Sequence, residues 1–244
     1  MSTYLERYQQ GNYEAVWAEL TALGSAVRDP GIMPDALDVA HETMRRAAAN
    51  VDTLIARLRG HGYRFGVADG NQFRPRRPHC PPSKNIAPKL ARLERLAGPV
   101  PLSLRAWYEV VGEVYLGGIA PWLDTDVLPD PLVVNSIDVA LYSVKDWHEE
   151  WHGVPLEERP ADEPCQAWIA PDEYHKEDIS GGPPYSIALP NAAADARVEF
   201  EWHNLDFVPY LREAFSCGGF PGLTRVPGGL PAVARDLSRD LLPL

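Results

Sequence analysis

The stretch that decides the fold is PLSLRAWYEVVGEVYLGGIAPW, residues 101–122. Its apolar side chains recur every three or four residues from Leu104 to Val111, which predicts a short helix that packs by one face. Ser103 precedes this run and is expected to accept hydrogen bonds from the first free backbone amides. Gly112 is expected to end the helix, and the Val-Tyr-Leu run after it is typical of a buried strand. The stretch therefore predicts a helix and a strand at the centre of a core, and it identifies no chemistry.

The residues before this stretch, 1–66, predict a helical hairpin. A first helical region ends at the turn formed by residues 29–31, and a long helix follows from Pro34 to Gly60. Because its apolar residues repeat every seven positions, they form a narrow seam that we expect to pack within the chain, with pairing of two copies as a homodimer as the alternative. The seam consists of Leu37, Met44, Val51 and Leu58, with Ala40, Ala47 and Leu54 between them.

Residues 67–87 are rich in proline and basic side chains and lack a periodic pattern, which predicts an extended linker. No aromatic platform accompanies the basic residues, so a nucleic-acid partner is not expected. The basic residues are Arg74, Arg76, Arg77 and Lys84. The predicted organisation is therefore a helical hairpin (1–66), a linker (67–87) and a main domain with a C-terminal tail helix (88–244).

After this linker and the central stretch, short strands without regular intervening helices favour an α+β domain, with a mostly antiparallel multi-stranded sheet packed with helices. In the last strand the apolar Val198, Phe200 and Trp202 are expected to face the core, so that the glutamates between them face water. Asp206 is expected to cap the helix that follows. The candidate strands are 131–135, 139–142, 166–170, 185–189 and 197–202.

The composition is that of a globular protein, with 244 residues of which 45% are hydrophobic. The sequence contains neither an apolar run long enough to span a membrane nor the pattern of a signal peptide, so a soluble cytoplasmic protein is expected. Its three cysteines are far apart in the sequence and predict neither disulfides nor a thiolate zinc site.

The net charge of −11 is unevenly distributed. Residues 106–224 carry 5 Lys/Arg and 22 Asp/Glu, whereas residues 67–105 carry 8 Lys/Arg and 2 Asp/Glu. A strongly acidic segment repels nucleic acid and anionic lipid, and it attracts basic partners at long range. The charge pattern therefore favours a basic protein partner, while a surplus that serves solubility alone is the alternative.

One motif suggests catalysis. His148, Glu149 and His152 fit the pattern H-E-x-x-H, in which two imidazoles one helical turn apart bind Zn²⁺ and the glutamate acts on a metal-bound water. A glycine and a proline follow within three residues and would break the helix that such a site needs. A zinc hydrolase with Glu173 or His175 as a third ligand is therefore kept as an alternative, and the leading interpretation involves no cofactor.

A family resemblance comes from residues 90–118, LARLERLAGPVPLSLRAWYEVVGEVYLGG, followed by DPLVV at 130–134. This pattern resembles the SUKH superfamily, whose members include bacterial immunity proteins that neutralise polymorphic toxins and relatives of a eukaryotic cell-wall synthesis regulator. The resemblance covers residues 88–222 and departs at Glu113, where members often have glycine or a polar residue. The matching positions are Leu93, Glu94, Pro101, Tyr108, Gly112, Val114 and Leu116.

The resemblance implies a non-catalytic binding domain that neutralises a toxin domain, often a nuclease. An acidic face fits this role because a nuclease presents a basic cleft. An intracellular scaffold or regulator that docks through the hairpin at 1–66 is the alternative on the same fold. The candidate partner-binding residues are Asp124, Asp126, Asp172, Glu173, Glu177 and Asp178.

Overall fold

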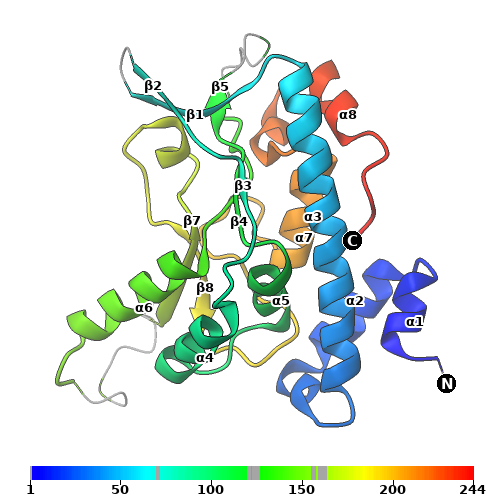
Figure 1. Ribbon diagram of the computed structural model, residues 1–244, viewed down its shortest axis with the longest axis vertical. Coiled ribbons are helices and arrows are strands. Elements are labelled where there is room, and N and C mark those ends of the chain that lie inside the picture. The colour runs from blue at the N-terminus through cyan, green and yellow to red at the C-terminus, as the bar shows by residue number, and fades with distance from the viewer. Residues whose placement is uncertain (1, 70–71, 120–121, 123–126, 155–157, 159–163) are drawn as a thin grey trace.

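The computed structural model describes residues 2–69, 72–119, 122, 127–154, 158 and 164–244 (Figure 1). Within these ranges the fold is α+β, as predicted, with eight α-helices and three small antiparallel sheets. The helices are α1 (Tyr4–Gln9), α2 (Tyr13–Ala22), α3 (Met33–Gly60), α4 (Ile86–Ala97), α5 (Leu102–Val110), α6 (Ile137–Glu150), α7 (Phe207–Ser216) and α8 (Ala232–Ser238). The strands are β1 (Arg64–Asp69), β2 (Gln72–Pro75), β3 (His79–Cys80), β4 (Glu113–Tyr115), β5 (Gly118–Ile119), β6 (Val133–Val134), β7 (Cys165–Ala170) and β8 (Tyr185–Leu189).

Helix α5 and strand β4 confirm the central helix and strand. Gly112, between them, has a φ of +93°, and a Cβ there would collide with the backbone at Cys80, so that only glycine fits this turn. Trp107 Nε1 donates a hydrogen bond to the Gly112 carbonyl oxygen at 2.8 Å, which ties the helix to its own end. The hydrophobic periodicity of the stretch therefore predicted both elements.

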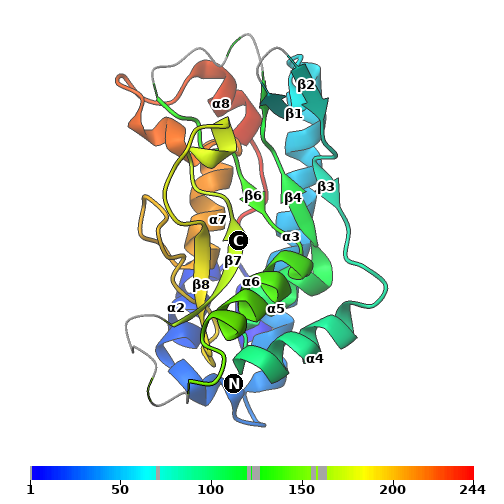
Figure 2. The same ribbon diagram turned by 90° about the vertical axis from the view of Figure 1, so that its left-hand side faces the viewer.

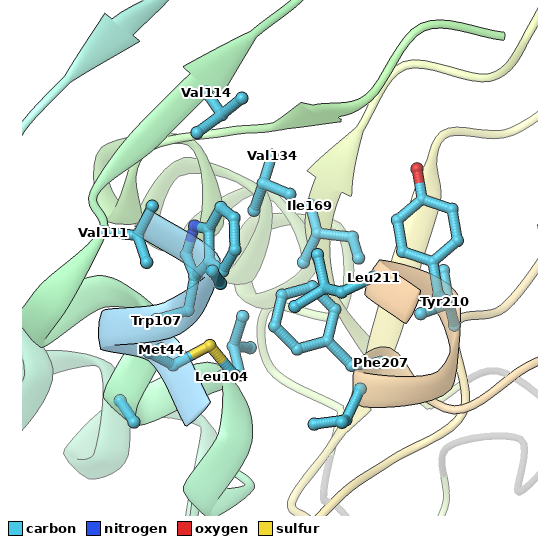
Figure 3. Close-up of a cluster of buried hydrophobic side chains, with 14 of the residues drawn as sticks. Met44, Leu104, Trp107, Val111, Val114, Val134, Ile169, Phe207, Tyr210 and Leu211 are labelled. Carbon is cyan, nitrogen blue, oxygen red and sulfur yellow. The ribbon is translucent and has the colours of Figure 1, made fainter. Parts of the chain in front are cut away.

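The core forms around the apolar face of α5. Leu104 and Trp107 meet Met44 of α3 and Phe207 of α7, and all four side chains are buried (Figure 3). The rings of Trp107 and Phe207 pack edge to face with their centroids 5.6 Å apart. The core is thus built from segments more than 150 residues apart in the sequence.

Asp195 connects the beginnings of α5 and α7. It accepts a hydrogen bond from Ser103 Oγ at 2.6 Å and another from the Val208 backbone amide at 2.9 Å. Ser103 therefore donates to a carboxylate instead of capping its own helix. Asp206 occupies the N-cap position of α7 as predicted, but its side chain pairs with Arg197 at 3.3 Å. Burial raises the pKa of Asp195 to about 7, although the hydrogen bonds from Ser103 and the backbone oppose this shift.

The long helix α3 runs along one side of the molecule (Figure 1). Its seam is buried against α1, α5 and α8 of the same chain, with Leu37 partly exposed. Asn50 of α3 also donates to the carbonyl oxygen of Leu242 at 2.9 Å and accepts from its amide at 2.7 Å. The N-terminal helices and the residues after position 88 consequently share one continuous hydrophobic core.

Two of the sheets lie side by side (Figure 2). Strands pair in the order β3-β4-β6, and the hairpin of β7 and β8 continues beside β6, where the Asn135 amide donates to the Ile169 carbonyl oxygen at 2.6 Å. The third sheet has the order β2-β1-β5. Helix α6 packs on β7, on the side of the sheet away from α3 (Figure 1).

The structure also differs from the sequence-based expectations in residues 67–87 and 139–142. Residues 67–87, expected to be a linker, contain the end of β1 and all of β2 and β3, which pair within sheets. Residues 139–142, expected to be a strand, lie inside α6, because a short apolar run reads alike for a strand and for the buried face of a helix. Among the described helices, none has the length and apolar character needed to cross a membrane.

Candidate binding surface

The candidate partner-binding residues fall in two places. Asp124 and Asp126 lie outside the described residues. The other four lie in residues 172–178, between β7 and β8, which we call the acidic loop; it contains the 3₁₀ helix η3 (His175–Glu177). The structure therefore brings together Asp172, Glu173, Glu177 and Asp178 in one short segment.

A buried ion pair anchors the acidic loop. Lys176 Nζ donates to Asp130 Oδ1 at 2.5 Å, and both side chains are buried. The Tyr185 hydroxyl donates to the other Asp130 oxygen at 3.2 Å, and Lys176 Nζ lies 4.5 Å from the centre of the Tyr185 ring. Burial raises the pKa of Tyr185, and the Asp130 charge raises it further. A charge pair removed from water in this way adds little net stability, but it ties the position of the loop to Asp130.

Glu177 and Asp178 follow the anchor. Glu177 is half-buried, and burial, together with the nearby charge of Asp130, raises its pKa to about 7. Asp178 is exposed and adopts a left-handed backbone with a φ of +58°, which aspartate tolerates better than most residues. The loop thus presents one carboxylate that titrates near neutral pH and one that faces solvent.

Asp172 shapes the loop from inside. It is buried, and its carboxylate accepts hydrogen bonds from the amides of Tyr174 (2.8 Å) and His175 (3.1 Å) and pairs with the His175 ring. Burial raises the pKa of Asp172, but these hydrogen bonds outweigh burial and hold the pKa below its ordinary value. A Cβ at Gly181 would collide with this carboxylate, so the glycine leaves the space that Asp172 occupies. Asp172 is therefore a structural residue of the loop.

Glu173 joins the acidic loop to a neighbouring turn, residues 199–204. Its carboxylate forms an ion pair with Arg225, whose guanidinium also lies 5.2 Å from the centre of the Trp202 ring. Arg225 thus contacts both the loop and the turn, and the two belong to one surface.

The turn at 199–204 reverses the expected side-chain pattern. Phe200 and Trp202, predicted to face the core, are 58% and 60% exposed, while Glu201, predicted to face water, is 5% exposed. The cause is a left-handed backbone at Phe200, with a φ of +65°, which interrupts the alternation of an extended strand. In place of a continuous strand ladder, the backbone forms isolated bridges at Glu199 and Arg197. The prediction of a regular strand here was wrong.

A charged pair holds Glu201 beneath the turn. His203 Nδ1 lies 2.6 Å from Glu201 Oε1, and His203 Nε2 lies 3.0 Å from the Thr224 hydroxyl oxygen. Because Thr224 donates its only hydroxyl proton to the Pro221 carbonyl oxygen, both His203 nitrogens act as donors, as in a protonated imidazole. The hydrogen bond with Glu201 accordingly raises the pKa of His203, against the effect of burial. The turn is therefore fastened by an imidazolium–carboxylate pair.

The H-E-x-x-H residues do not share one helix face. Helix α6 ends at Glu150, so His152 lies in the turn beyond it, and His148 Nε2 hydrogen-bonds the Leu96 carbonyl oxygen at 2.8 Å. Glu173 and His175, the suggested third ligands, pair with Arg225 and Asp172. Across the described ranges, no group of three or more His, Cys, Asp or Glu is placed to hold a metal ion.

Comparison with protein-family models, with curated proteins and with solved structures gives no match for this chain. The surface is thus interpreted from its own geometry.

Sequence reasoning identified the acidic loop but missed Asp130, Lys176 and Arg225, whose roles depend on partners about 50 positions away in the sequence. It also missed the exposed Phe200 and Trp202. Residues 197–206 contain no glycine that would have indicated a turn there.

Proposed function

We propose that this protein is a non-catalytic binding protein that engages a basic protein domain through the acidic loop. The observation that carries the proposal is the buried Lys176–Asp130 pair, which fixes the loop before any partner arrives. A preformed loop loses little conformational entropy on binding, so more of the interaction energy appears as affinity.

Charge supports the same role. Two cations beside the loop are already engaged within the chain, Lys176 by Asp130 and Arg225 by Glu173, which leaves the exposed carboxylate of Asp178 to attract a partner. Such a surface accelerates encounter with a basic partner and excludes acidic ones. Together with the resemblance to the SUKH superfamily, this favours an immunity-like protein that neutralises a toxin domain by covering a basic cleft.

The test is affinity capture from source cells with three forms of the full chain: the wild type, an acidic-loop variant and a control. The acidic-loop variant is Glu177→Gln with Asp178→Asn, which removes both carboxylates at nearly constant shape, since asparagine also tolerates the left-handed backbone. The control is Glu149→Gln with Glu150→Gln, which removes two exposed charges from the last turn of α6.

The expected result is a protein with a Lys/Arg-rich domain that binds the wild type and the control and binds the acidic-loop variant at least about tenfold more weakly. Its binding should also weaken between about 50 mM and about 500 mM salt, because screening shortens the range of charge attraction. Equal capture of the same proteins by all three forms, independent of salt, would contradict the proposal.

A further inference from the structure

Phe200 and Trp202, which we call the aromatic tip, form the most exposed aromatic pair next to the acidic loop. Aromatic side chains of this size normally bury most of their surface, and tryptophan and tyrosine dominate the binding energy of protein interfaces. Two of them lie on one turn, with one residue between them, and each leaves much of its apolar surface uncovered by the fold.

The backbone of the tip is strained in a way that exposes it. A phenylalanine with a φ of +65° is uncommon, since its Cβ crowds the backbone in the left-handed region. An extended backbone at Phe200 would return Phe200 and Trp202 to the side of Val198, which is buried. The strained conformation instead buries Glu201 and turns both rings outward.

The tip is also held still. Glu201 is fastened by His203, and the guanidinium of Arg225 lies over the Trp202 ring while it pairs with Glu173. A ring under a cation loses rotational freedom before a partner arrives, which lowers the entropic cost of binding. Trp202 is therefore restrained by Arg225 before a partner arrives, on a turn that Glu201 and His203 fasten.

Charge around the tip indicates its occupant. Glu199 stands on the same turn, and the acidic loop adjoins through Glu173, whereas the nearby cation Arg225 is already paired. A partner surface that covers the tip therefore needs an apolar pocket for the two rings and basic side chains around that pocket.

We propose that Phe200 and Trp202 are the principal anchor of the protein interface, and that they insert into an apolar pocket rimmed by Lys or Arg on the basic partner. This inference rests on the proposed function for the sign of the partner's charge. It adds that the affinity depends on the tip, while the acidic loop sets the rate of encounter and the choice of partner.

The probe is a phage-displayed library of random twelve-residue peptides, selected on the full-length wild type. Selected peptides are then measured against the acidic-loop variant, against a tip variant (Phe200→Ala with Trp202→Ala) and against Tyr142→Ala. Tyr142 is 60% exposed on α6 and provides a matched loss of an exposed aromatic ring. Because Phe200, Trp202 and Tyr142 are exposed, the tip variant and Tyr142→Ala should keep the wild-type melting temperature, which a thermal scan checks.

The expected peptides combine Lys or Arg with aliphatic or aromatic residues. The tip variant should lower their affinity by about 30-fold or more, the acidic-loop variant by a smaller factor that shrinks with salt, and Tyr142→Ala not at all. Phe200→Gly gives a second readout, because relief of strain should raise the melting temperature while affinity falls. A residue with only a structural role would not separate these two quantities in this way.

Two outcomes separate this inference from the proposed function. Basic peptides that still bind the tip variant but are lost from the acidic-loop variant would overturn the anchor and leave the proposed function standing. Apolar peptides that are lost from the tip variant, yet respond neither to salt nor to the acidic-loop variant, would support the anchor and contradict the proposed function. Peptides that bind all variants equally, or selection of acidic peptides, would overturn both.

Discussion

Two buried regions of this protein are held together by opposite means. Around α5, Trp107 and Leu104 pack against apolar side chains from α3 and α7, so burial itself stabilises the contacts (Figure 3). Beneath the acidic loop, Lys176 and Asp130 are equally buried, but as a charged pair whose removal from water costs free energy. The first region determines whether the chain folds, whereas the second determines the shape of a surface. Under the proposed function, the charged region is retained because it shapes the binding surface.

The largest expected effect is on the charged region. Lys176→Met leaves Asp130 buried without a counterion and should lower the free energy of unfolding by about 3–5 kcal/mol, measured by urea denaturation. Adding Asp130→Asn removes that charge and should restore most of the loss, since asparagine accepts the backbone φ of +48° at this position. Lys84→Met, at an exposed lysine, serves as the control. A double variant as unstable as the single one would show that the two regions do not differ as described.

The next effect concerns the pair beneath the turn. His203→Ala deprives the buried Glu201 of its donor and should cost about 1.5–3 kcal/mol of unfolding free energy. Because the pKa of His203 is raised above 6.5, the pair stabilises the fold fully below pH 6.5, and this contribution is lost as the pH rises through the raised value. The destabilisation should therefore shrink in alkaline buffer. His152→Ala, at an exposed histidine, should change stability little at any pH.

A smaller effect should appear at Glu177. Its folded pKa of about 7 lies above its ordinary value of 4.5, so its protonated form stabilises the fold fully below about pH 4.5, and this contribution is lost as the pH rises through about 7. In the Glu177→Gln variant, the melting temperature should fall less steeply over that pH range. Its free energy of unfolding at pH 8 should exceed that of the wild type by on the order of 1–2 kcal/mol, allowing for solvent screening of this half-buried group. A pH profile identical to that of the wild type would place the titration elsewhere.

The smallest expected effect is at Phe200. Phe200→Gly should raise the free energy of unfolding by about 0.5–1 kcal/mol, because glycine adopts a φ of +65° without steric crowding. Phe200→Ala removes the same ring and keeps the crowding, so it should give no such gain. Comparing the two variants by thermal denaturation isolates the strain of the tip, and equal stabilities would show that the tip is unstrained.

The apolar region could be predicted from the sequence, and the charged region could not. The spacing of Leu104 and Trp107 and the seven-residue repeat of α3 indicate which helix face is buried, because apolar residues recur on the face that packs against the core. Lys176 lies in a mixed-charge run that is typical of a solvated loop, and its partner Asp130 is 46 residues away, so nothing local marks it as buried. The alternating pattern of residues 197–202 gave a wrong prediction, because the left-handed backbone at Phe200 exchanges the two faces of the strand.

The position of Asp195 has a consequence for local opening. One carboxylate holds the hydroxyl of Ser103 in the first turn of α5 and the amide of Val208 in the first turn of α7. Neither helix start can fray alone without leaving a buried carboxylate short of donors. The first-turn amides of the two helices should consequently exchange with deuterium as one cooperative unit, although about a hundred residues separate them. The turn that carries Phe200 and Trp202 lies just before α7. The start of this helix, which supports the turn, should therefore open only together with the start of α5.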